Sequence, residues 1–148
     1  MSQNLKFLFA PLDAAGHIYA SIGIAQQLLS RGHTVVFVTP NSFKGKLKPL
    51  GIAEEYIQEP HEGVSKEEWI ERINLVRPLL ALTPLGILEH FFVPYYKWMV
   101  EDTKNNDFKL RKIMDNVKPD VVVVDIFMQN PALVDQGKHS NKKLIIFN

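Results

Sequence analysis

The sequence predicts an α/β protein, a parallel β-sheet with helices on both faces. Short apolar runs alternate with amphipathic segments along the chain, a pattern typical of a doubly wound sheet. One run, the four valines at 121–124, is apolar at every position, as a strand buried on both faces requires. We expect five strands in the order 3-2-1-4-5, which is usual for a Rossmann-like fold, in a single domain spanning residues 1–148.

The first strand–helix–strand unit occupies residues 5–40. A strand over 5–9 is followed by the small residues 14–16 and then by an amphipathic helix. Its apolar side chains share one face: Ile18, Ile22, Ala25, Leu28 and Leu29. Gly32 is placed to end this helix, and the next strand lies within 33–40.

The next segments are shorter. Asn41 and Ser42 are expected to cap a short helix, which Pro49 and Gly51 end. That helix would carry three apolar residues on one side: Phe43, Leu47 and Leu50. A third strand is expected within 52–57.

Residues 60–118 are predicted to be helical and irregular. Ser65 with Glu68 forms a capping-box pattern, and Thr83 followed by Pro84 predicts the start of another helix. Pro94 is expected to end or kink that helix. A later helix carries apolar residues from 108 to 117, with Asp107 as its cap.

The C-terminal part returns to strands. The strand within 118–127 has Asp125 after its valines, Asn130 and Pro131 begin a short helix, and 142–148 form the last strand. If that strand lies at an open edge of the sheet, we expect it to favour a homodimer or strand exchange with a second copy, with Lys142 and Lys143 partly protecting it.

Composition excludes several classes of function. Lys and Arg number 17 against 16 Asp and Glu, so no basic excess points to a nucleic-acid partner, and the lysines at 44, 46 and 48 are assigned to a solvated surface. Cysteine is absent, which excludes disulfides and thiolate chemistry. No apolar stretch reaches the roughly 20 residues of a membrane helix, and no secretory signal precedes residue 13. We therefore expect a cytoplasmic protein with no membrane partner.

The main candidate site combines His17 with Asp125. His17 follows the first strand and Asp125 ends the fourth, and these strands are neighbours in the expected order. A carboxylate there could fix the tautomer of the imidazole and stabilise its cation while the other nitrogen accepts a proton. The alternative is that Asp125 only caps a turn and His17 is structural.

Other motifs limit the cofactor. The turn before His17 is not GxGxxG, and no GxxxxGK[ST] occurs, which disfavours nicotinamide and P-loop chemistry. Gly16 would let the backbone approach a ligand, and the helix N-terminus after it suits a diphosphate. The remaining histidines lack metal-ligand spacing and are assigned to surface or packing positions: His33, His61, His90 and His139. We expect no metal and no cofactor.

An aromatic set could line a pocket for an apolar ligand. Its members are Trp69, Phe91, Phe92, Tyr95, Tyr96 and Trp98. Aromatic residues at helical spacing also occur as ordinary core, so both interpretations stay open.

Two segments carry a resemblance to a known family. The stretch FLFAPLDAAGHIYASIGIAQQLLSRGHTVVFVT resembles the N-terminal start of the UDP-glycosyltransferases, inverting enzymes of GT-B fold, and KPDVVVVDIFMQNPAL looks like their later strand that ends in the catalytic aspartate. The segments APLDAAGH and KGKLKPLGIAEEY look most like those of arthropod, mite-like members of this family.

The resemblance implies a reaction. His17 would deprotonate a hydroxyl of a small lipophilic acceptor, Asp125 would orient and balance His17, and the acceptor oxygen would displace UDP with inversion. The N-terminal domain mainly binds the acceptor, which the resemblance assigns to Trp69, Phe91, Phe92, Tyr95 and Tyr96, with UDP-sugar as co-substrate near Gly16.

The family's enzymes are about three times as long, and their second domain binds the donor. The resemblance therefore implies an N-terminal acceptor-binding domain, incomplete at its C-terminus, without the donor-binding domain and inactive by itself. Two alternatives remain: a non-catalytic ligand-binding or merely stable truncated protein of the same fold, and an unrelated flavodoxin-like nucleotide-binding domain.

Overall fold

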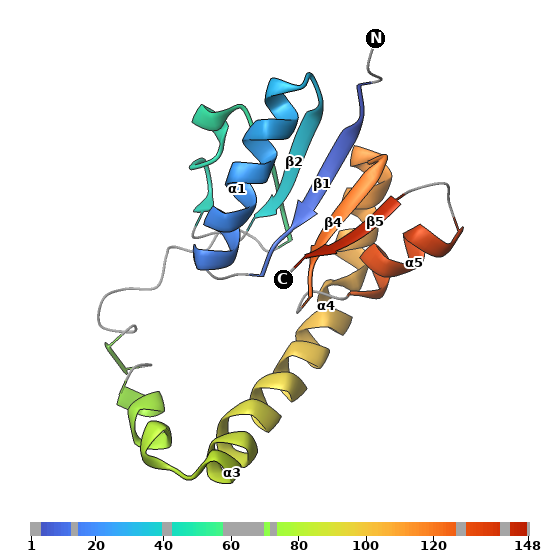
Figure 1. Cartoon of the computed structure of the whole chain (residues 1–148). Helices are drawn as coiled ribbons and strands as arrows, with labels where there is room; N and C mark the ends of the chain where they lie inside the picture. The colour runs from blue at the N-terminus through green and yellow to red at the C-terminus, as the bar shows by residue number, and fades with distance from the viewer. Residues whose placement is uncertain are drawn as a thin grey trace. The chain divides into compact units, whose positions relative to one another are not determined.

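A five-stranded sheet in the order β3-β2-β1-β4-β5 forms the centre of the computed structural model (Figure 1). The structure describes residues 4–12, 15–39, 43–57, 70–71, 74–126, 130–139 and 143–147. The strands are β1 (Lys6–Ala10), β2 (Thr34–Thr39), β3 (Ala53–Tyr56), β4 (Val121–Asp125) and β5 (Lys143–Phe147). Every neighbouring pair is parallel, so the predicted class and strand order are confirmed.

Helical segments connect the strands. They are α1 (Ala15–Ser30), the 3₁₀ turns η2 (Lys48–Leu50) and η3 (Arg77–Ala81), α3 (Pro84–Ile87), the π-helical η4 (Leu88–Phe92), α4 (Val93–Val117) and α5 (Pro131–His139). Two compact units result: Met1–His61 with Asn106–Asn148, and Glu62–Asn105. The first, called the sheet unit below, holds all five strands. The second, called the helical unit, holds η3, α3, η4 and the start of α4.

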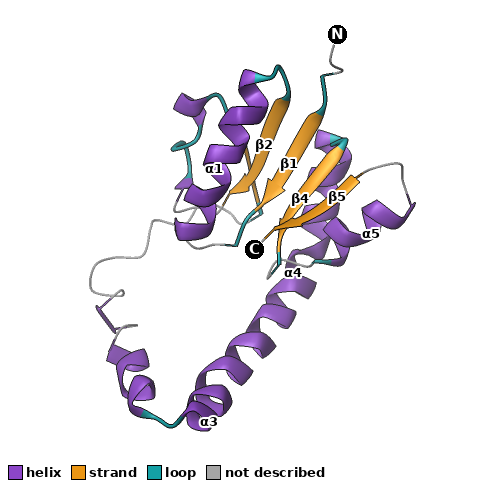
Figure 2. Ribbon diagram, in the orientation of Figure 1, coloured by secondary structure: helices purple, strands orange, loops and turns teal. Residues whose placement is uncertain are grey.

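Two apolar clusters cover the two faces of the sheet, because side chains alternate along each strand. Phe7 and Phe9 of β1 belong to the cluster that includes Ile18 and Ala25 of α1. Leu8 of β1 belongs to the other cluster, which includes residues of α4 and α5. Figure 2 shows α1 on one face and α5 with the end of α4 on the other, as the doubly wound prediction requires.

Some predicted helix boundaries are wrong. Asp107 lies inside α4, not before it. Pro94 is the second residue of α4, which directly follows the π-helical η4, so the interruption expected at this proline takes the form of a change from π-helix to α-helix. The helix expected around Leu47 is reduced to the 3₁₀ turn η2, which contains Pro49.

Other boundaries agree with the prediction or lie outside the described part. The Thr83 hydroxyl accepts a hydrogen bond from the Gly86 amide at 3.2 Å, as a helix cap does. Asn130 caps α5, since its side-chain oxygen accepts from the Ala132 amide at 2.8 Å. The predicted caps Asn41, Ser42, Ser65 and Glu68 lie outside the described residues.

Candidate functional site

His17 and Asp125 lie together at the carboxyl edge of the sheet. Ala10 at the end of β1 pairs with Val124 of β4, so Asp125 directly follows the paired residues. His17 is in the first turn of α1, which packs on one face of the same sheet. From β1 the chain adds β2 and β3 on one side of the sheet and then β4 and β5 on the other. Open α/β sheets bind ligands at this switch point between β1 and β4.

The two side chains are in direct contact. His17 Nδ1 lies 2.6 Å from Asp125 Oδ2, and the Leu12 amide donates to the same oxygen at 3.5 Å. Asp125 is fully buried, whereas the His17 side chain is 34% exposed. Because an ionised carboxylate only accepts hydrogen bonds, Nδ1 carries the hydrogen of this contact. In a neutral imidazole, Nε2 then holds the lone pair that can take up a proton.

Packing of α1 fixes His17 against the sheet. The buried residues of α1 are Ile18, Ser21 and Ala25. The other apolar residues predicted on this face are partly buried and pack against the same cluster: Ile22, Leu28 and Leu29. The Ser21 hydroxyl donates to the His17 carbonyl at 2.8 Å. The position of His17 is thus fixed by the buried Ile18 next to it and by the hydrogen bond from Ser21 in the following helical turn.

Gly16 is open on its outer side. Among the described residues, and apart from its chain neighbours and the backbone of its own helix, no heavy atom lies within 4 Å of the position that a Cβ would take there. Its backbone does not adopt the left-handed conformation. Neither strain nor packing among the described residues therefore explains a glycine at this position. That Gly16 contacts a sugar donor stays a prediction.

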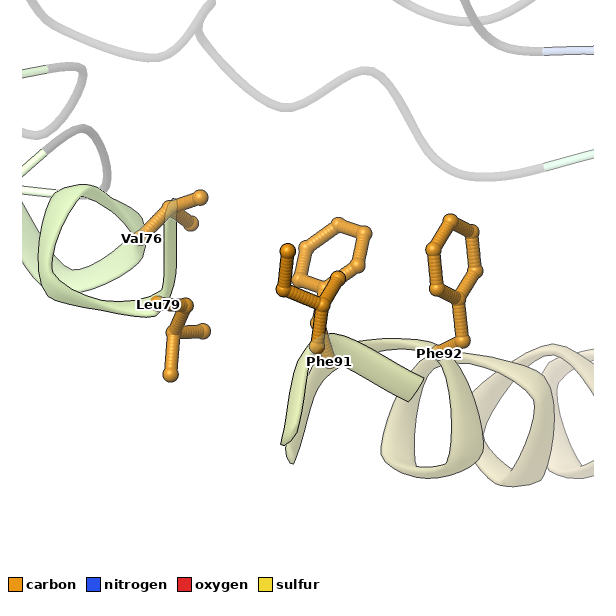
Figure 3. A pocket seen from close by; sticks show the side chains of 5 residues that line it. Val76, Leu79, Phe91 and Phe92 are labelled. Atoms are coloured by element: carbon orange, nitrogen blue, oxygen red, sulfur yellow. The ribbon is translucent and has the colours of Figure 1, made fainter. Parts of the chain in front are cut away.

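The predicted aromatic residues lie in the helical unit and divide into two groups. Phe91 and Phe92 line an apolar pocket of about 150 Å³ together with Val76, Leu79 and Ile87 (Figure 3). Tyr95 stacks on Phe91, with 6.1 Å between ring centroids, and Tyr96 stacks on Phe92 at 6.5 Å. These tyrosines contact the lining rings and are not among the residues that line the pocket.

Trp69 and the side chain of Trp98 lie outside the described residues. Sequence reasoning missed Val76, Leu79 and Ile87. The only available signal was the apolar content of residues 74–82, which has no helical period and is interrupted by Arg77 and Pro78.

The other histidines described have separate roles. His33 Nδ1 accepts from the Leu5 amide at 3.2 Å, and its ring contacts Phe7. His90 is exposed, while His61 and the side chain of His139 lie outside the described part. Among the residues described, no group of three potential metal ligands occurs, and none of the described helices is long and apolar enough to cross a membrane.

No known family model matches the sequence, and no curated protein matches it. Solved structures do match in fold. The spinosyn rhamnosyltransferase SpnG is 14% identical with a TM-score of 0.67, over 97% of this chain and 34% of that one. The calicheamicin glycosyltransferase CalG4 is 19% identical with a TM-score of 0.63, over 98% and 32%.

A third similar structure is UGT89C1 of Arabidopsis thaliana in complex with UDP-L-rhamnose, 16% identical with a TM-score of 0.54, over 99% and 36%. SpnG has also been solved with thymidine diphosphate and with spinosyn aglycone. The chain spans about one third of the length of these structures. At such low identity the likeness establishes the fold alone: the chain has the fold of the N-terminal half of a GT-B glycosyltransferase.

Proposed function

We propose that this chain is the acceptor-binding part of a nucleotide-sugar-dependent glycosyltransferase, with His17 as the base and Asp125 as its partner. The observation that carries the proposal is the 2.6 Å contact between these side chains at the switch point of the sheet. The same fold occurs in solved glycosyltransferases, which supports this reaction over others that a histidine–aspartate pair could perform.

In the proposed reaction, Nε2 of His17 takes the proton of an acceptor hydroxyl. The acceptor oxygen forms a bond to the anomeric carbon of the sugar, while the bond from that carbon to the nucleoside diphosphate breaks on the opposite side. Configuration therefore inverts. The buried Asp125 carboxylate stabilises the imidazolium until the proton leaves, and burial strengthens this interaction by lowering the local dielectric constant.

We propose a nucleoside-diphosphate sugar, and UDP-sugar in particular, as the donor. The support is that similar structures are complexes with thymidine diphosphate and with UDP-L-rhamnose. The start of α1 would lie near the diphosphate, because Gly16 leaves its backbone accessible and helix N-termini favour anions. Since the chain spans about one third of those structures, we expect donor binding to need a further domain.

For the acceptor we propose a small lipophilic molecule with a hydroxyl group, bound by the aromatic region of the helical unit. Complexes of similar structures with spinosyn aglycone and with quercetin support this class of acceptor. Phe91 and Phe92 would contact it directly, and Tyr95 and Tyr96 would support their rings. Trp69 remains a proposed member of this region.

The test measures UDP release from UDP-glucose with a panel of phenolic and lipophilic acceptors, together with acceptor binding. If turnover occurs, His17→Ala should lower it by about 10²- to 10⁴-fold, while the exposed His90→Ala should not change it. Saturable acceptor binding without turnover would support an acceptor-binding domain that needs its donor-binding partner. If the chain shows no acceptor binding and no turnover, the proposal is refuted.

A non-catalytic ligand-binding protein of the same fold is the second candidate, and the apolar pocket lined by Phe91 and Phe92 supports it. Acceptor binding that is unchanged when a donor-binding domain is supplied, with no sugar transfer, would decide for this candidate.

We also propose that the outer edge of β5 can pair with a second copy. The Lys143 amide donates to the Asp120 carbonyl, and the Phe147 carbonyl accepts from the Ile126 amide. Because the backbone groups of successive strand residues point to alternate sides, those of Leu144 point away from β4. Ile145 is 47% exposed on this edge strand. Because the chain has no cysteine, Ile145→Cys should form disulfide-linked dimers under mild oxidation, and a clean monomer at high concentration would refute the pairing.

A further inference from the structure

The pocket of the helical unit has an entirely apolar lining. Val76 and Leu79 come from the η3 side, while Ile87, Phe91 and Phe92 come from α3 and η4 (Figure 3). We propose that this half-open pocket binds a single apolar ring of phenyl size, and that it selects the ring by size and by apolar contact, without a polar contact. This inference deepens the proposed function. Binding of the ring does not depend on that function, but the role of the bound molecule as an acceptor does.

The volume sets the size of the ligand. The pocket measures about 150 Å³. An enclosed cavity of roughly this volume that was engineered into another protein, lined by leucine, isoleucine and phenylalanine, binds benzene. The lining here has the same chemistry but is open to solvent on one side, so an apolar ring would displace water that makes no hydrogen bond to the lining.

A tight turn holds the two walls together. Thr83 caps α3 through the Gly86 amide, and a Cβ added at Gly86 would lie only 3.1 Å from Leu82 Cβ. The chain between η3 and η4 is therefore closely packed at this point. A larger residue at position 86 would require Leu82 to shift, so glycine suits this close packing.

The aromatic wall is a supported layer. Phe91 and Phe92 contact each other edge to face, with ring centroids 5.3 Å apart, and Tyr95 and Tyr96 stack behind them. Both phenylalanines lie in the π-helical segment η4, and such segments are rare and frequent at functional sites. Phe92 is 41% exposed, so a ligand can reach the pocket without unfolding of the wall.

The experiment titrates the full chain with 4-fluorotoluene and follows the ligand by ¹⁹F NMR. This ligand has no hydroxyl group and cannot accept a sugar, so binding is measured apart from transfer. We expect saturable binding with a dissociation constant in the range of about 0.1–10 mM, which suits so small a ligand. 4-Fluorophenol should bind no more tightly, because the lining offers its hydroxyl no partner.

Two tryptophan variants form a matched pair. Leu79→Trp fills the pocket and should weaken binding at least tenfold, whereas Leu75→Trp adds the same bulk at a nearby side chain that is 78% exposed and should leave binding unchanged. Circular dichroism checks that both variants fold. If Leu79→Trp does not fold, Phe92→Ala, which removes a half-exposed wall, should weaken binding in its place.

Absence of 4-fluorotoluene binding, or binding that these substitutions do not weaken, would overturn the pocket proposal. Tighter binding of 4-fluorophenol would overturn recognition without a polar contact. Either result leaves the His17–Asp125 proposal standing. Turnover that His17→Ala does not lower would refute that proposal and leave the pocket standing, so the two failures are distinguishable.

Discussion

Neutralising Glu54 should loosen the segment that supports α1. Glu54 of β3 accepts hydrogen bonds from the backbone amides of Gly45 and Leu47, both at 2.7 Å, from that of Lys48 at 3.2 Å, and from the Tyr56 hydroxyl. One carboxylate thus organises residues 45–48. Within and beside this turn, Phe43 and Leu47 are buried in the cluster that also contains Ile18 and Ala25 of α1.

The expected loss follows from the number of bonds. Glu54→Gln keeps the size of the side chain and one acceptor oxygen, so all four bonds lose their charged acceptor and about two of them lose their acceptor altogether. Each hydrogen bond to a charged group contributes about 1.5–3 kcal/mol when buried, and partial exposure of Glu54 reduces this. We expect the free energy of unfolding to fall by about 1–2 kcal/mol, which corresponds to roughly 3–6 °C in melting temperature for a domain of this size.

The pH dependence gives a second readout. Burial alone would raise the pKa of Glu54, but the bonds from Tyr56 and the three amides outweigh it and lower that pKa below its ordinary 4.5. The stabilisation by ionised Glu54 is therefore present above pH 4.5 and is lost as the pH falls through the lowered value. The difference between wild type and Glu54→Gln should shrink to near zero in acid.

Urea denaturation followed by circular dichroism measures both effects. Glu55→Gln is the matched control, because it makes the same charge change at the adjacent residue of β3. Equal stabilities of the two variants at pH 7, within about 0.3 kcal/mol, would refute the role given to Glu54. A constant difference down to acid pH would show that its charge is not responsible.

Three further substitutions test separate features. Lys118 has a positive φ of 49°, so Lys118→Gly should raise the free energy of unfolding by about 0.5–1 kcal/mol, and a lower urea midpoint would contradict this. Asp107 accepts from the Ala132 amide at 3.0 Å and from Arg111 Nε at 2.7 Å, so Asp107→Ala should lower the free energy of unfolding by about 1 kcal/mol, and an unchanged urea midpoint would count against these contacts. Gly16→Ala should leave thermal stability unchanged or slightly raised, because its Cβ would meet nothing within 4 Å, and a clear fall in melting temperature would disprove that the position is open.

The sheet could be predicted from sequence because its strands have simple signatures. The valines of β4 are apolar on both faces, and β1 and β2 are equally apolar, so a parallel sheet covered on both sides was the consistent interpretation. Helix boundaries were less accessible. The polar residues 105–107 suggested a break before Phe108, yet Asp107 lies within α4 because Arg111 and the start of α5 hold its carboxylate.

The site was accessible in part for the same reason. The order of strands alone placed His17 near Asp125, since both follow neighbouring strands at one edge of the sheet. The pocket in the helical unit was not accessible, because Val76 and Leu79 lie in an irregular segment where no period marks a common face. Only the folded turn around Gly86 brings them opposite the phenylalanines.

The contact between His17 and Asp125 depends on the register of β1 against β4. Val121 and Val123 belong to the cluster under α1, and Asp125 has the same parity, so its side chain lies on the face of His17. A slip by one residue would turn Asp125 to the other face.

The valines of β4 do not oppose such a slip by themselves, because they are apolar on both faces of the sheet. The polar contacts at the opposite end of β1 do. The Lys6 amide donates to the Asp120 carboxylate at 2.8 Å, the Asp120 amide donates to the Lys6 carbonyl at 2.9 Å, and Lys6 Nζ donates to the Val117 carbonyl at 2.9 Å. The geometry of the candidate catalytic pair is therefore set in part by polar contacts at the amino edge of the sheet, one strand length away from it.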